Sequence, residues 1–237
     1  MNSPLPHQSA AHAPTSPEQP AEEGVHRRRT AVSALGREVR ALVDATVRTT
    51  AAPDALLRVA DGVRVLTAQL TGRRARADIP VVDEFPGGVR MYSPVTGTGS
   101  PLAPPLEVTR LDGGVAGTCV LGIAHEGPPG YGHGGISAML LDESMGWACA
   151  TAGMPGMTVS LQMRYHRPVP LEAPLRVLAH VRGTEGRKVY VTGSITSEDD
   201  LATVLVAAEG VFVSPDPEHA RALFPGLRDS GGTSAGR

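Results

Sequence analysis

The 237-residue sequence has few aromatic residues, few cysteines and little net charge. Only 3% of its residues are Phe, Trp or Tyr, and its formal net charge is −2. A chain so close to neutrality has no excess of positive charge, so we expect neither nucleic acid nor a membrane surface as a partner. The two cysteines, Cys119 and Cys149, lie in apolar segments and fit buried free thiols better than a disulfide.

Long apolar runs are also missing. None approaches the roughly 18 residues that a membrane-spanning helix needs. The first 24 residues lack the apolar core of a secretory signal peptide, so we expect a cytoplasmic protein. Apolar residues nevertheless make up 41% of the chain, which is enough to form a core.

The composition changes along the chain. The first residues are rich in Pro, Ala, Ser and Glu, which is typical of disorder. Apolar residues then recur at helical spacing from 30 to 71 in two stripes, with Pro53 at a suitable first position for the second helix. The predicted parts are a disordered tail (1–25), a helical extension (26–76), a loop or linker (77–105), the main domain (106–214) and a C-terminal tail (215–237).

The main domain has the pattern of strands around one helix. The sequence DGG at 112–114 marks a tight hairpin, and further turn signals separate the later apolar runs. The predicted strands are 106–111, 115–124, 157–165, 174–183, 187–197 and 201–213. One long apolar helix separates the second strand from the third. This order indicates an α+β fold with a mostly antiparallel sheet packed on that helix.

The helix begins in the stretch GYGHGGISAMLLDESMGWACA, residues 130–150. Its glycines satisfy G-x-G-x-x-G, the pattern of a dinucleotide-binding turn. A single strand-helix-strand unit with no acid near the end of the next strand argues against that interpretation. A purely structural alternative is a glycine turn capped by His133.

Two carboxylates, Asp142 and Glu143, interrupt this apolar helix. A helix that is apolar nearly all round is expected to be buried, and a carboxylate there is costly unless it is paired or hydrogen-bonded. Such a group is a candidate general base or nucleophile. Free N–H groups at the helix start, beside Gly134 and Gly135, could stabilise an oxyanion. These parts fit acyl transfer from an activated ester.

The segments HGGISAMLLD and MTVSLQMRYHRPVPL resemble the hotdog-fold acyl-CoA thioesterases. The most similar branch is the phenylacetate-pathway (PaaI-type) group, which is related to the 4-hydroxybenzoyl-CoA thioesterases. That family has a His-Gly-Gly turn with an acid nine residues after the His, which is Asp142 here. The resemblance covers about residues 86–214. It implies an antiparallel sheet wrapped around one long central helix, to which this chain adds an N-terminal helical extension.

The resemblance also implies roles for single residues. Asp142 would be the general base or the nucleophile. The Gly134 N–H would polarise the thioester carbonyl, with Gly135 as a weaker candidate. His133 would position the substrate or the turn, and Thr158 would orient a water molecule.

Other assignments stay open. Family members carry either Asp or Glu at the catalytic position, so Glu143 competes with Asp142 for this role. Arg164, Arg167 and Arg187 either contact coenzyme A phosphates or are ordinary surface charges. The residues do not choose between a water-activating and an anhydride-forming route.

The family's active sites lie between subunits, so the resemblance predicts a homodimer or homotetramer that binds acyl-CoA, with no metal or other cofactor. The alternative function is a non-catalytic protein that binds acyl-CoA or a small apolar ligand on the same fold. The acid at position 142 favours the enzyme, because a binding protein has no need of a buried carboxylate.

Overall fold

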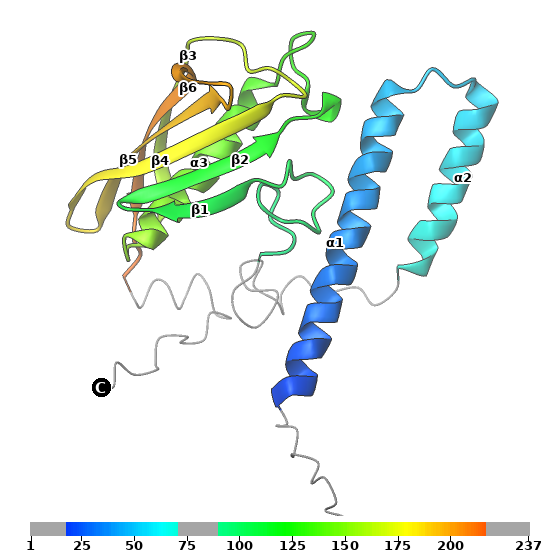
Figure 1. Cartoon of the computed structure of the whole chain (residues 1–237), viewed down its shortest axis with the longest axis horizontal. Helices are drawn as coiled ribbons and strands as arrows, with labels where there is room; N and C mark the ends of the chain where they lie inside the picture. The colour runs from blue at the N-terminus through cyan, green and yellow to red at the C-terminus, as the bar shows by residue number, and fades with distance from the viewer. Residues whose placement is uncertain (1–17, 71–89, 217–237) are drawn as a thin grey trace, which may run out of the picture.

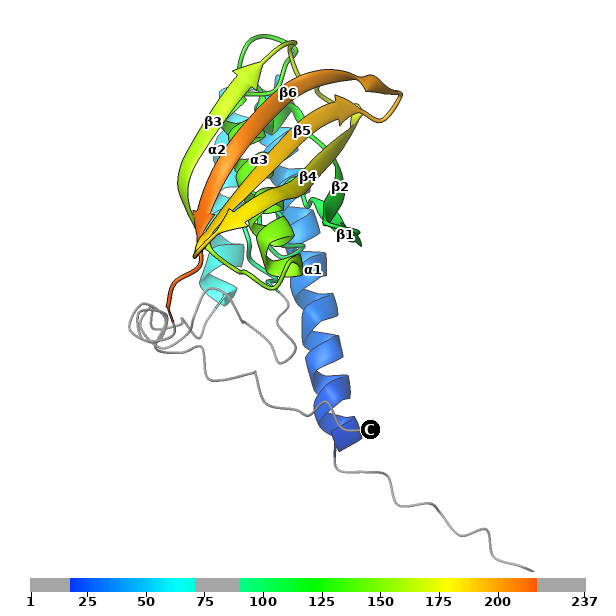
Figure 2. The same cartoon turned by 90° about the vertical axis from the view of Figure 1, so that its left-hand side faces the viewer.

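The computed structural model describes residues 18–70 and 90–216. It contains helices α1 (Glu18–Arg48), α2 (Pro53–Gln69) and α3 (Gly134–Thr151), the 3₁₀ turn η1 (Ile123–His125), and strands β1 (Glu107–Leu111), β2 (Gly114–Val120), β3 (Met157–Tyr165), β4 (Pro174–Glu185), β5 (Lys188–Ser197) and β6 (Asp200–Val213). The sheet wraps around α3, as Figures 1 and 2 show. The predicted α+β hotdog fold is therefore confirmed.

The six strands form one sheet in the order β1-β2-β4-β5-β6-β3, and all neighbours are antiparallel. Strands β1 and β3 are its edges. The second strand was predicted to reach residue 124 but ends at Val120. After it, Leu121 is fully buried and its carbonyl accepts a hydrogen bond from the Glu172 N–H at 2.7 Å, so the chain leaves the sheet and enters η1.

The core lies between α3 and the inner face of the sheet. Helix α3 buries Leu140, Leu141 and Met145 completely. A Cβ added to Gly193 would lie only 2.9 Å from Leu141 Cδ2, so a glycine here lets the helix lie close to the sheet. The sequence had predicted a buried helix, but α3 is not buried on every side. The sheet covers one side only, and Asp142 on another side is half-buried.

Two N-terminal helices were predicted and are present (Figure 1). Helix α1 begins at Glu18, so the predicted disordered tail of residues 1–25 is too long. Pro20 falls in the first helical turn, where no intrahelical N–H bond is required, and Ala and Glu residues favour helix after it. The rest of that predicted tail, the linker up to residue 89 and the C-terminal tail from 217 lie outside the described residues.

The loop from 90 to 105 is an ordered part of the fold that packs against α1. The Arg40 guanidinium donates to the carbonyls of Thr98 at 2.8 Å and Ser100 at 2.7 Å, and the Ser33 and Thr98 hydroxyls lie 2.7 Å apart. Helix α2, in contrast, has no buried residue. None of the helices in the described ranges combines the length and hydropathy needed to cross a membrane.

Candidate active site

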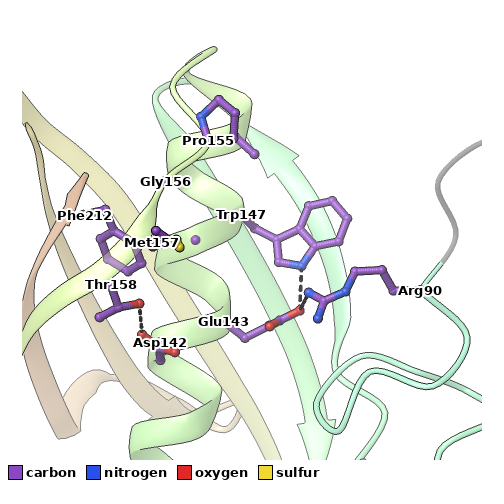
Figure 3. Close-up of a pocket in the computed structure, with 11 residues that line it drawn as sticks. Arg90, Asp142, Glu143, Trp147, Pro155, Gly156, Met157, Thr158 and Phe212 are labelled. Atoms are coloured by element: carbon purple, nitrogen blue, oxygen red, sulfur yellow. Dashed lines mark hydrogen bonds and ion pairs between the residues drawn. The ribbon is translucent and has the colours of Figure 1, made fainter. Parts of the chain in front are cut away.

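Asp142 lies on the side of α3 that faces the start of β3. Its Oδ1 accepts a hydrogen bond of 2.6 Å from the Thr158 hydroxyl, as Figure 3 shows. Strict alternation along a strand would put Thr158 on the same face as Ser160 and Gln162. A register shift between Thr158 and Ser160 instead turns Thr158 towards α3, while Ser160 and Gln162 line a hollow on the outer face.

Glu143 is occupied by other partners. Its Oε1 accepts hydrogen bonds from Arg90 Nη1 at 2.8 Å, from the Trp147 indole N–H at 3.3 Å and from the Ser93 hydroxyl at 3.5 Å. Its side chain is only 16% exposed. Among the described residues no cation forms an ion pair with Asp142. The two neighbouring carboxylates therefore differ: Glu143 is neutralised by Arg90, and Asp142 accepts a hydrogen bond from a hydroxyl.

Both carboxylates line a cavity of about 590 Å³ beside α3. Figure 3 shows Asp142 and Thr158 on one side of the helix and Glu143 with Arg90 on the other. The remaining lining is made of apolar side chains and glycines: Gly146, Trp147, Ala150, Pro155, Gly156, Met157 and Phe212. No sequence pattern singles out Arg90, because it comes from a loop without periodicity and joins Glu143 across 53 residues.

The start of α3 has the capping geometry that the glycine turn allows. His133 is the N-cap residue, and its Nδ1 accepts the Gly135 N–H at 2.9 Å. The Gly135 N–H is therefore occupied, which removes it as an oxyanion donor in this arrangement. The Gly134 N–H has no acceptor among the described residues. The Tyr165 hydroxyl donates to the Gly134 carbonyl at 3.0 Å, so the end of β3 holds this turn in place.

The three candidate arginines lie in different places, and Arg187 forms an ion pair with Asp216 at 3.4 Å. Arg167 lines a hollow of about 320 Å³ at the start of α3, together with Gly134 and Tyr165. Arg164 lines a separate hollow on the outer face of the sheet, beside Glu209. The structure thus brings Arg167 to the helix start, but brings Arg164 neither there nor to Asp142.

Gly134 and Asp142 are too far apart to act together within one chain. They are eight positions apart on the α-helix, which corresponds to roughly 12 Å along the axis. Each lines a different hollow. In the described part of the chain, no group of three or more His, Cys, Asp or Glu side chains could hold a metal ion.

Comparisons with known proteins show the family of the chain. The sequence model of the Thioesterase superfamily matches residues 129–204, which include α3, β3 and the residues at both ends of the site. Acyl-coenzyme A thioesterase THEM4 of Mus musculus is 35% identical over 97 residues, 41% of each chain. The chain therefore matches about two fifths of the length of this curated relative.

Solved structures extend the comparison. The Escherichia coli PaaI protein is 17% identical, over 46% of this chain and 83% of that one, with a TM-score of 0.43, which is too weak a likeness to bear on function. The crystal structure of a thioesterase superfamily protein is much more similar, with 40% identity and a TM-score of 0.69. The match covers 77% of this chain and 94% of that one. On this evidence the chain belongs to the thioesterase superfamily.

Proposed function

We propose that the protein hydrolyses acyl-CoA thioesters, with Asp142 as the reacting carboxylate and the Gly134 N–H as the oxyanion donor. The observation that carries the proposal is the hydrogen bond between Thr158 and Asp142 in the wall of a large, mostly apolar cavity. Acyl-coenzyme A thioesterases among the curated relatives support this substrate class. Glu143 is the weaker candidate, because Arg90 already neutralises it.

Thr158 binds Oδ1 of Asp142 and leaves Oδ2 for the reaction. If Oδ2 takes a proton from water, the water oxygen adds to the thioester carbon and the carbonyl electrons move onto oxygen, where the Gly134 N–H donates. Collapse of this intermediate breaks the C–S bond, and the coenzyme A thiolate takes the proton back from Asp142. If Oδ2 instead attacks the carbon, the thiolate leaves and water then hydrolyses the mixed anhydride. A labelled acyl group retained on the protein after rapid quenching during one turnover would identify the second route.

The distance between Gly134 and Asp142 requires a second subunit. Strand β3 is a sheet edge, and its first residues hold Asp142 through Thr158 while its last residue, Tyr165, holds the Gly134 turn. Antiparallel pairing of β3 with β3 of a second copy, centred near Leu161, sets the start of one strand against the end of the other. We infer that Asp142 of each subunit then faces Gly134 of its partner, which gives two sites per dimer. The pairing also covers an exposed edge.

Asp142→Asn tests the assignment directly. It keeps the shape of the side chain and removes its basicity, so kcat should fall by about 10²–10⁴ while the melting temperature and acyl-CoA binding are retained. Asp112→Asn, in the exposed turn between β1 and β2, is the matched control. Normal turnover by Asp142→Asn would assign the chemistry to another group.

A complementation experiment tests the shared site. Gly134→Pro removes the N–H at a first helical position, where the backbone accepts proline. The new Cβ would lie 3.3 Å from the Tyr165 ring, which must move by a few tenths of an ångström, so the folding of the variant is checked by circular dichroism. Each single variant should be inactive, but a mixed dimer of Asp142→Asn and Gly134→Pro chains has one complete site. Random mixing should restore about one quarter of wild-type activity, since half of the dimers are mixed and each has one of two sites. No recovery, or an active monomer by light scattering, would contradict the shared site.

A further inference from the structure

Glu143 binds three side chains at one oxygen. Arg90 and Ser93 reach Oε1 from the loop that packs on α1, and Trp147 reaches it from the next turn of α3. Figure 3 shows the Glu143 side chain between the Trp147 indole and the Arg90 guanidinium. Because the indole N–H has Glu143 as its acceptor, the carboxylate fixes the orientation of the ring in the cavity wall.

Arg90 is held in place from two directions. Ser93, which is 1% exposed, accepts the backbone N–H groups of Val95 and Thr96 at 3.2 Å each and so closes a turn next to Arg90. Farther along the same loop, Arg40 of α1 binds the Thr98 carbonyl. The N-terminal extension therefore fixes the loop that presents Arg90 to the cavity.

The charges of the cavity lining follow from these contacts. Arg90 contributes one positive charge, and Glu143 and Asp142 contribute one negative charge each, so the formal sum is −1. The ion pair cancels the one cation among the described lining residues. A ligand carboxylate that enters would lose its hydration, find no unpaired cation among the described residues that one subunit contributes to the lining, and lie near the negative charge of Asp142.

We propose that Glu143, paired with Arg90 and bound to Trp147, makes this cavity the acyl pocket and restricts it to uncharged acyl groups. Glu143 acts as a specificity-determining residue and not as a base. The inference rests on the proposed thioesterase function, to which it adds the substrate class. It also assigns the α1 extension a role, which is to hold the Arg90 loop against the pocket.

Glu143→Gln should change the specificity. Glutamine retains an oxygen that can accept from Trp147 and Arg90, but it removes the charge that neutralises Arg90. The guanidinium then becomes available to a carboxylate at the end of the acyl chain. Butyryl-CoA and succinyl-CoA suit this test, because both acyl groups have four carbons and only succinyl ends in a carboxylate.

The experiment measures kcat/KM for both thioesters with the wild type, Glu143→Gln and the Arg90→Gln/Glu143→Gln double variant. The wild type should prefer butyryl-CoA. Glu143→Gln should move the ratio towards succinyl-CoA by at least about tenfold, as expected for one charge-assisted hydrogen bond, and the double variant should reverse most of this gain. An unchanged ratio in Glu143→Gln, or a wild type that hydrolyses both equally, overturns the inference.

Binding measurements separate this inference from the proposed function. Trp147 is the single tryptophan of the chain and lines the cavity, so its fluorescence reports occupancy without turnover. In the Asp142→Asn background, added Glu143→Gln should strengthen the binding of succinyl-CoA relative to butyryl-CoA. If the wild type hydrolyses neither thioester but this shift occurs, the proposed reaction fails and the pocket assignment stands. If hydrolysis occurs and the shift does not, only the pocket assignment fails.

Gly146→Ala gives a second test that does not depend on charge. A Cβ at Gly146 would lie 3.9 Å from Phe212, an ordinary contact inside the cavity, and alanine favours helix over glycine. The variant should fold at least as stably as the wild type and yet turn over phenylacetyl-CoA less well relative to acetyl-CoA. An unchanged ratio would show that the acyl group binds elsewhere.

Discussion

Thr158→Val tests whether the hydroxyl organises Asp142. Valine keeps the branched shape of threonine and removes the donor of the 2.6 Å hydrogen bond. A hydrogen bond to a charged group contributes about 1.5–3 kcal/mol, which corresponds to about ten- to hundredfold in rate if the bond is fully used in the transition state. Because Thr158 acts on the reacting carboxylate, the loss should fall mainly on kcat and leave KM nearly unchanged.

The assay is release of the free coenzyme A thiol over a range of acyl-CoA concentrations, with Thr158→Ser as the matched control. Serine retains the hydroxyl, so it should keep most of the wild-type kcat, and circular dichroism should show the same melting behaviour for all three proteins. A valine variant with wild-type kcat would refute the reasoning. So would a serine variant as slow as valine, because the hydroxyl would then not be the group that matters.

Two further predictions concern packing and the thiols. Gly193→Ala places a Cβ 2.9 Å from Leu141 Cδ2 and should lower the free energy of unfolding by about 1–3 kcal/mol. Gly183→Ala, whose Cβ would have nothing within 4 Å, should leave it unchanged. Equal denaturant midpoints for the two variants would contradict the close helix–sheet contact. Burial raises the thiol pKa of Cys119 to about 12 and that of Cys149 to about 11. Alkylation of both cysteines at pH 8 should therefore be slow in the native protein, faster as the pH rises towards these values and rapid after denaturation. Fast alkylation of the native protein, measured by mass spectrometry, would refute their burial.

Much of the fold could be predicted from the sequence because its signals are local. Apolar stripes, the DGG turn with Gly113 at a φ of 69°, and the alternating runs located two N-terminal helices, the central helix and six strands. The strand predictions were wrong where packing against the rest of the fold overrides the local pattern. A register shift between Thr158 and Ser160 placed Thr158 on the side opposite to the one that strict alternation indicates, and β2 ended early at the buried Leu121.

The candidate site likewise has one part that the sequence predicts and one part that depends on tertiary packing. The sequence alone determined that the glycine turn, His133 and Asp142 lie at fixed spacings along one helix, because helical geometry depends only on spacing along the chain. Only the tertiary structure decided which of the two carboxylates is paired with a cation. Adjacent residues on a helix point in different directions, so Asp142 meets Thr158 from β3, and Glu143 meets Arg90 from a loop 53 residues earlier in the chain. Such a contact depends on how the loop packs against α1, and no periodicity in the sequence records that packing.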